Sequence, residues 1–263
     1  MLTELQIKKI ISKQIEQSIT NYFSKKRETT FHVLDYIFPY ERKVRSMIGG
    51  LETSLGTQLW EKIATEISRE NNFSILNHKE FNKSVPILPN SILGKISDFK
   101  EKKRRNPNIK NTLFLEELTT FIKNNNITSK NEQINKGTGI DLWIKKDNTE
   151  YIFDIKTNQI NAGGGNTLLS NQLHWYAHRS LMENHCNIKC YIAFPFNPYS
   201  EIDFWKKTGN RISPLIPTEE AIVGDEFWDL LSGSKNTTKI IFDTFKELGE
   251  SGFGNKFMER FKK

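Results

Sequence analysis

The sequence predicts an α/β protein in which helices and strands alternate around a β-hairpin. Apolar residues recur at helical spacing over residues 3–24 and again over about 51–69. Between residues 139 and 156, two apolar-rich arms flank a polar tip, which is the pattern of a hairpin. A helical pattern at about 168–183 precedes an apolar strand at 190–196. No repeat or linker-like stretch interrupts the chain, so we expect a single domain of residues 1–263.

The hairpin is where the candidate chemistry gathers. Asp147 and Asn148 at its tip tolerate the left-handed backbone of a tight turn. With these two residues as the loop, Asp141 falls opposite Asp154, at roughly 5 Å between Cβ atoms. Side chains alternate along a strand, so Lys156 shares a face with Asp154. The hairpin is therefore predicted to place two carboxylates and one ammonium on one side of a sheet edge.

Such a cluster suits metal-assisted phosphodiester hydrolysis. Adjacent carboxylates repel unless a cation lies between them, and Mg²⁺ accepts carboxylate oxygens while keeping several waters. A lysine nearby can orient or help to deprotonate one of those waters. The alternative is a surface hairpin with two solvated aspartates. Asp-x-Lys also occurs at residues 98–100, but only 154–156 has an apolar lead-in and a partner Asp on the neighbouring arm.

Composition favours a polyanionic partner. The 263 residues have a net charge of +7, which suits nucleic acid first and a membrane surface second. Two cysteines form no disulfide framework. The apolar residues near the N-terminus are spaced rather than contiguous, and no apolar run approaches the roughly 20 residues that span a bilayer. We expect a soluble, cytoplasmic protein without a membrane partner.

Two basic or glycine-rich stretches are candidates for DNA contact. The strongest positive run, residues 100–105, is either a phosphate-contacting loop or a solvated one. Residues 161–166 feed a helix, as a loop approaching DNA or as a flexible connector. The candidate DNA-binding residues are Lys102, Lys103, Arg104, Arg105, Asn161 and Asn166.

The other elements are read from periodicity and breakers. Gly49-Gly50 precede the second helix, and residues 73–76 form a short strand. Residues 77–112 are polar and broken by prolines, residues 113–123 are helical, and residues 199–263 are mostly helical.

A histidine and cysteine cluster has the composition of a zinc site. Its members are His174, His178, His185, Cys186 and Cys190. Because the last cysteine leads into an apolar strand, where cysteine is usually a small core residue, we favour a structural role over zinc.

The order helix, strand, hairpin with Asp…Asp-x-Lys, helix, strand resembles the core of the PD-(D/E)XK nuclease superfamily over roughly residues 50–197. The resemblance implies a central mixed β-sheet flanked by helices, with helical extensions at both ends of the chain. Asp141, Asp154 and Lys156 occupy the motif positions, and Ile140 stands where the family usually has proline.

The resemblance also implies roles for these residues. Asp141 and Asp154 bind Mg²⁺, the backbone carbonyl of Ile155 contributes, and Lys156 positions or activates the attacking water. The family often adds a glutamate from its first core helix, and Gly56-Thr-Gln-Leu-Trp-Glu61 is similar to that pattern with one extra residue. Glu61 is therefore the favoured fourth catalytic residue. The competing candidates are Glu52 and Glu117, which lie on or beside apolar stripes.

Residues 45–61, the Asn161-Ala-Gly loop and Gln172-Leu-His-Trp-Tyr-Ala177 are similar to TdeIII-type type II restriction endonucleases. This likeness implies a Mg²⁺-dependent homodimer, with Mn²⁺ able to substitute, that cuts a short palindrome of GGNCC type and leaves 5′-phosphate ends. The alternatives are another PD-(D/E)XK nuclease of repair or recombination, and a non-catalytic DNA-binding module.

Overall fold

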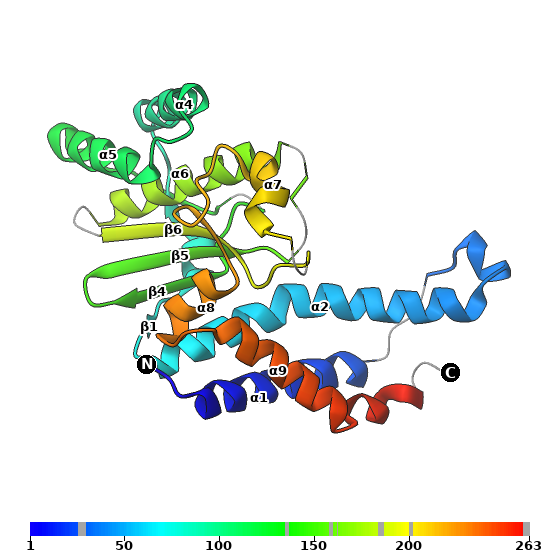
Figure 1. Cartoon of the computed structure of the whole chain (residues 1–263). Helices are drawn as coiled ribbons and strands as arrows, with labels where there is room; N and C mark the ends of the chain where they lie inside the picture. The colour runs from blue at the N-terminus through cyan, green and yellow to red at the C-terminus, as the bar shows by residue number, and fades with distance from the viewer. Residues whose placement is uncertain are drawn as a thin grey trace. The chain divides into compact units, whose positions relative to one another are not determined.

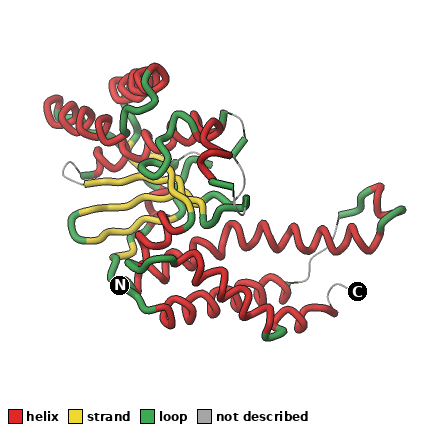
Figure 2. The backbone as a smooth tube through the Cα atoms, in the orientation of Figure 1, coloured by secondary structure: helices red, strands yellow, loops and turns green. Residues whose placement is uncertain are grey.

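The computed structural model describes residues 1–25, 30–134, 137–157, 160–161, 163–183, 187–199 and 202–259. The chain divides into two compact units, one made of Met1–Asn71 with Asp229–Lys263, the other of Asn72–Trp228. The described part of the first unit is helical, and the second holds the strands (Figures 1 and 2). A single nuclease domain with a core at about 50–197 stays a prediction.

The first unit is built on three helices, α1 (Glu4–Ser24), α2 (Pro39–Glu70) and α9 (Thr237–Glu250), with short 3-10 turns η1 (Val33–Tyr36) and η2 (Phe253–Phe257). The α1 helix packs against both α2 and α9. Its predicted apolar stripe is buried at Ile7, Ile11 and Ile15, which confirms the sequence reading.

The α2 helix differs from its prediction because it begins at Pro39 and runs through Gly49-Gly50. Proline is favoured in the first helical turn, where its missing N–H leaves no bond unmade. The Tyr22 hydroxyl donates to the Met47 carbonyl at 2.7 Å, and a Cβ on residue 50 would lie 2.5 Å from that hydroxyl oxygen. Glycine at position 50 therefore allows α1 to approach α2 instead of ending the helix.

The second unit contains a five-stranded sheet in the order β1-β4-β5-β6-β7. Antiparallel pairing joins β1 to β4 and β4 to β5, whereas β5, β6 and β7 are parallel. The predicted mixed sheet flanked by helices is thus confirmed. The strands are β1 (Ser74–Ile75), β4 (Leu142–Lys146), β5 (Thr149–Ile155), β6 (Asn187–Phe194) and β7 (Ala221–Val223).

Helices cover this sheet, and α6 makes the crossover between the parallel strands β5 and β6 (Figure 1). Its Leu169, Leu173 and Tyr176 are buried in the main hydrophobic cluster together with Ile152 and Ile192 of the sheet. Two short strands, β2 (Val85–Pro86) and β3 (Asn131–Glu132), pair separately. The described helices of this unit are α3 (His78–Lys83), α4 (Asn90–Arg105), α5 (Asn111–Asn125), α6 (Gly164–Met182) and α7 (Phe204–Ile212), and α8 (Asp225–Ser232) crosses the boundary between the two units.

The largest departure from the sequence reading lies between residues 77 and 112, where the structure has α3 and α4 in place of a broken polar stretch. Ile92, Ile96 and Phe99 of α4 are buried at helical spacing. Charged residues between them obscured this stripe, because α4 buries only one narrow face.

Candidate active site

The β4–β5 hairpin has the predicted turn and register. Asp147 adopts a left-handed φ of 52°, and Lys146 pairs with Thr149 across a two-residue loop. Leu142 pairs with Phe153, so the next pair toward the open end joins Asp141 to Asp154. The expectation of a sheet edge is wrong, because β1 flanks β4 and β6 flanks β5. The strands on either side hold both arms of the hairpin in place.

Asp154 is the buried member of the carboxylate pair, with a relative exposure of 3%. The Lys156 ammonium lies 2.7 Å from its Oδ1 atom, as their shared face predicts. Burial raises the pKa of Asp154 from 3.8 to about 7; Lys156 opposes the rise, and the charge of Asp141 adds to it. A buried carboxylate beside a second carboxylate is a site where a cation would be stabilising.

Asp141 is half-buried and is fixed across the hairpin by two hydrogen bonds. Its backbone N–H donates to the Phe153 carbonyl at 2.9 Å. Its Oδ2 atom accepts from the backbone N–H of Ile155 at 2.8 Å. The second bond orients the Asp141 carboxylate toward the residue that separates Asp154 from Lys156.

Asn82 of α3 holds the backbone immediately before Asp141. Its side-chain amide donates to the Ile140 carbonyl at 2.9 Å, and its Oδ1 atom accepts from the Ile140 N–H, also at 2.9 Å. A Cβ on Gly139 would lie 2.8 Å from Asn82 Oδ1, so glycine is needed for this approach. The sequence analysis missed Asn82, because no spacing links residue 82 to residue 140.

Lys156 also borders a surface hollow. Thr157, Ile160, Phe194 and Phe204 line this hollow together with neighbouring residues of the second unit. The lysine is partly exposed, in contrast to the buried Asp154. The Lys156 side chain is therefore partly in contact with solvent while its ammonium contacts the carboxylate.

The donor set fits a hard divalent cation. Asp141 and Asp154 supply carboxylate oxygens, and the Ile155 carbonyl is the backbone oxygen that Mg²⁺ or Mn²⁺ would add. Within the described ranges, no group of three or more His, Cys, Asp or Glu side chains is arranged to hold a metal ion. Metal binding by Asp141 and Asp154 stays a prediction.

The three glutamate candidates have different surroundings. Glu61 is half-buried in α2, whereas Glu52 of the same helix is exposed. Both belong to the first unit and the aspartate pair belongs to the second. Glu117 of α5 forms an ion pair with Lys102, with 3.0 Å between its Oε1 atom and the lysine Nζ atom. The fourth carboxylate stays a prediction, with Glu61 favoured by the family resemblance.

The basic run at residues 100–105 is the last part of α4, not a loop. Lys102 pairs with Glu117, while Arg104 and Arg105 both pair with Glu101. Arg104 and Arg105 remain largely exposed. DNA contact by these exposed cations stays a prediction.

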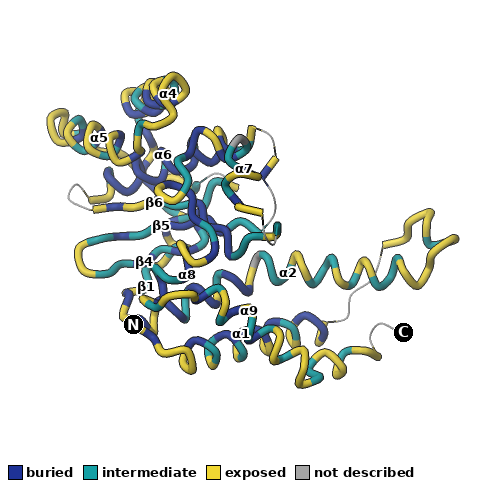
Figure 3. Tube along the Cα trace, viewed as in Figure 1, coloured by how far each residue is buried: buried dark blue, intermediate teal, exposed yellow. Residues whose placement is uncertain are grey.

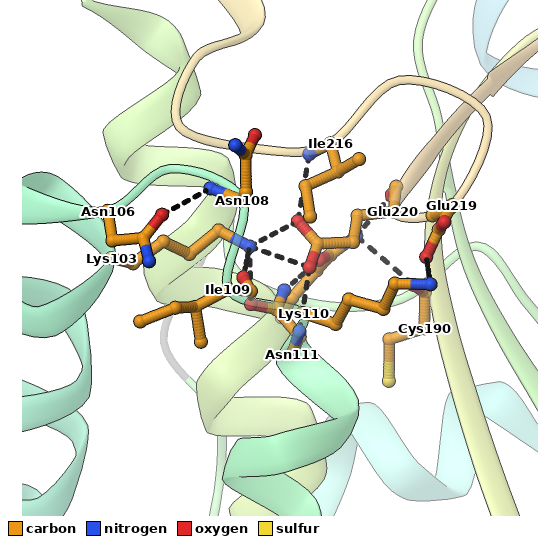
Figure 4. A network of polar contacts seen from close by, with 11 residues as sticks. Lys103, Asn106, Asn108, Ile109, Lys110, Asn111, Cys190, Ile216, Glu219 and Glu220 are labelled. Atoms are coloured by element: carbon orange, nitrogen blue, oxygen red, sulfur yellow. Dashed lines mark hydrogen bonds and ion pairs between the residues drawn. The ribbon is translucent and has the colours of Figure 1, made fainter.

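Lys103 is the exception in this run, because its side chain is fully buried. Its Nζ atom donates to both carboxylate oxygens of Glu220 at 2.6 Å and to the Ile109 carbonyl at 2.7 Å (Figure 4). Glu220 also accepts from the backbone N–H groups of Asn111 and Ile216. Lys103 is therefore not placed to contact a DNA phosphate, contrary to the prediction from the sequence. Its ammonium is buried and forms an ion pair with Glu220.

Asn161 and Asn166 are both exposed, the second in the first turn of α6. DNA contact by these two residues stays a prediction.

The zinc candidates are only partly described, because His185 and Cys186 lie outside the described residues. His178 is buried with Nδ1 2.9 Å from the Pro86 carbonyl, and burial lowers its pKa to about 4. Cys190 is a buried free thiol in β6, as expected of a core cysteine.

A mixed sheet whose inner hairpin ends in two carboxylates and a lysine is compatible with the core of restriction-endonuclease-like nucleases. A model of the type II restriction endonuclease family HinfI matches residues 3–249, and the chain belongs to that family. The TdeIII-type likeness and its GGNCC target stay predictions.

The type II restriction enzyme MjaII of Methanocaldococcus jannaschii is 28% identical over 225 residues. The match covers 79% of this chain and 55% of MjaII, so the chain spans about half the length of that curated relative. Among the described helices, none is long and apolar enough to cross a membrane.

Proposed function

We propose that this chain is a divalent-metal-dependent endonuclease that cuts double-stranded DNA at a short palindromic site. The observation that carries the proposal is the Asp141–Asp154–Lys156 cluster at the open end of the hairpin. The family match supports the same activity, because its description is that of a type II restriction endonuclease. The proposal places this cleavage in the cytoplasm.

The residues divide the work by their positions. Asp141, Asp154 and the Ile155 carbonyl would hold Mg²⁺, or Mn²⁺ in its place, and Glu61 would complete the shell. The bound ion supplies Lewis-acid stabilisation of the charge that develops on the phosphate. Lys156, in contact with Asp154, orients the attacking water and favours loss of its proton. Water adds to phosphorus as the P–O3′ bond breaks, which leaves a 5′-phosphate and a 3′-hydroxyl.

The deciding experiment is digestion of a sequenced plasmid and genome with the purified chain in Mg²⁺. Discrete bands with 5′-phosphate ends at one short motif, abolished by a chelator, are expected. The first motif to test is GGNCC, which the TdeIII-type likeness implies. Cuts that follow DNA structure instead of sequence would indicate a repair or recombination nuclease. Binding without any metal-dependent cleavage would indicate a DNA-binding module.

A homodimer is part of the proposal. One hairpin supplies one cluster, while a double-strand cut needs two nicks. Two copies related by a dyad match a palindrome with the fewest different contacts. Sedimentation equilibrium of the protein, free and on DNA that it cuts, measures this; a single chain in both states would contradict it.

A further inference from the structure

A group of large apolar side chains is exposed in the residues that lead into α2 and in its first turn. Each member is more than half exposed, and Tyr36 reaches 83%. The stretch is drawn as exposed in Figure 3. Inside the group, the rings of Phe31 and Tyr36 meet edge to face at 5.3 Å. We call these residues the apolar tip; they are Phe31, Val33, Tyr36, Ile37, Phe38 and Tyr40.

The apolar tip is large for a surface that stays in water. At the roughly 150–250 Å² that a large aromatic residue can bury, the four aromatic members together expose on the order of 500 Å², and Val33 and Ile37 add to that area. The largest apolar patch on a typical monomer is about 300–600 Å². A standard protein interface buries about 800 Å² on each partner. The tip thus offers a large part of the area of one side of an interface.

The α2 helix extends this surface. From Pro39 to Gln58, no residue whose burial is described is buried, although Val44, Ile48, Leu51 and Leu55 recur at spacings of four, three and four. This spacing makes an apolar stripe of the kind that packs against another helix. Further along α2, Leu59 and Ile63 are buried within the first unit. The stripe is therefore only partly covered where it leaves that core.

We propose that the apolar tip and the adjoining α2 stripe are the surface on which a second copy of this chain docks. A dyad lets the same patch face itself, so one surface serves both partners. Homodimer interfaces are more apolar than other interfaces, which suits the tip. Asp35, the acidic residue between its members, is already paired with Arg42. The neighbouring cations Arg42, Lys43 and Arg45 suit phosphate, whereas the aromatic and aliphatic side chains of the tip itself suit an apolar partner surface. This inference rests on the proposed function in one respect: the proposed double-strand cut is the reason why two copies are needed.

The test is the oligomeric state of the full chain. Sedimentation equilibrium at micromolar concentration should give a dimer for the wild type. The triple variant Val33→Ser, Tyr36→Ser, Ile37→Ser should raise the dimer dissociation constant about a hundredfold or more, because apolar interface anchors each contribute over about 1 kcal/mol. A matched variant, Leu5→Ser, Ile202→Ser, Phe242→Ser, removes exposed apolar residues elsewhere and should remain dimeric.

Hydrogen exchange of the wild type provides a measurement that needs no variant. Amides of residues 31–40 should exchange more slowly as the protein concentration rises through the dimer dissociation constant. A monomeric wild type would overturn the proposal, as would a triple variant that stays dimeric or a control variant that dissociates equally. Amide exchange at residues 31–40 that does not depend on protein concentration would also overturn it.

Two further readouts separate this proposal from others. The wild type should not co-sediment with vesicles of phosphatidylcholine and phosphatidylserine. Co-sedimentation of a monomeric protein with these vesicles would indicate that the tip binds lipid and would overturn the dimer. DNA cleavage is scored independently. A wild type that dimerises through the tip but never cuts DNA refutes the proposed function alone, whereas a cutting enzyme whose dimer ignores the tip refutes this inference alone.

Discussion

Oδ2 of Asp141 accepts a 2.8 Å hydrogen bond from the backbone N–H of Ile155, so the first carboxylate is fastened to the strand that carries the second. The antiparallel ladder between β4 and β5 continues to Asp141, whose backbone N–H donates to the Phe153 carbonyl. The distance between the two aspartates is consequently set by the sheet and not by a flexible loop. Loss of one carboxylate should leave the other in place.

Asp154→Asn should reduce Mg²⁺-dependent DNA cleavage by roughly a thousandfold or more, because losing a metal ligand removes several kcal/mol of stabilisation of the transition state. The measurement is the initial rate of plasmid cleavage at saturating Mg²⁺. Asp147→Asn is the matched control, because Asp147 is exposed in the turn and Asn tolerates its left-handed φ of 52°. Equal rates in the Asp154 variant and the control would refute the site.

The same substitution should stabilise the metal-free protein at alkaline pH. The pKa of Asp154 is raised from 3.8 to about 7, so the native state keeps a proton that the unfolded chain has already released between about pH 4 and 7. In the wild type, the contribution of Asp154 to the free energy of unfolding is fully present below about pH 4 and is lost as the pH rises to about 7. Melting in a chelator from pH 5 to 8.5 should show Asp154→Asn gaining over wild type as pH rises. Asp147→Asn should follow wild type; parallel curves for all three would contradict the raised pKa.

Of the three glutamate candidates, Glu61→Gln should show the largest loss of cleavage with DNA binding retained. Gln keeps the shape of Glu but lacks the charge that holds Mg²⁺, so high Mg²⁺ or Mn²⁺ should partly restore the rate. Glu52→Gln and Glu117→Gln are the comparison variants, each checked for native melting. Normal cutting by Glu61→Gln together with a defect in Glu52→Gln would show that the apolar stripe was the better guide.

DNA binding should weaken steeply with salt, with a log–log slope near −0.9 for each phosphate contact. Replacing Lys102, Arg104 and Arg105 by Gln should flatten the slope by less than three full contacts, because these cations are shared with Glu117 and Glu101. Lys103 is left intact because it is buried. A control with Gln at Lys8, Lys239 and Lys246 removes the same charge from the first unit. Identical slopes in the two variants would identify the end of α4 as a solvated face.

Lys103→Met should lower the free energy of unfolding by about 3–5 kcal/mol, because it leaves the Glu220 carboxylate buried without its partner. Glu220→Gln should cost a comparable amount. The double variant should be more stable than the sum of the two losses predicts, since neither charge remains. Denaturant unfolding of the four proteins measures this coupling. Additive losses would show that the pair does not act as a unit.

The sequence predicted the hairpin well because its information is local. The turn residues, the alternation and the apolar arms all lie between residues 139 and 156, and together they determine which side chains face each other. The same logic identified Asp141, Asp154 and Lys156 before any long-range contact was known. The α1 and α5 helices were predicted for a similar reason, since each has a regular apolar stripe.

What the sequence did not predict depends on partners distant in the chain. The use of Asn82 as a backbone clamp and the burial of Lys103 both need contacts over 58 and 117 residues. A lysine within a charged run has no local sign of burial. Gly49-Gly50 indicated a helix boundary because their low helix propensity is visible in the sequence, whereas the Tyr22 hydroxyl that Gly50 accommodates is not.

The Lys103–Glu220 pair also constrains how this chain can diverge. Changing either residue first passes through a protein with a buried, uncompensated charge, whereas Arg104 and Arg105, one and two positions away, can change at little cost in stability. Positions 103 and 220 should therefore be exchanged together among related chains, or not at all. A swap that transplants α4 and α5 from a relative must bring that relative's residue at position 220 with them.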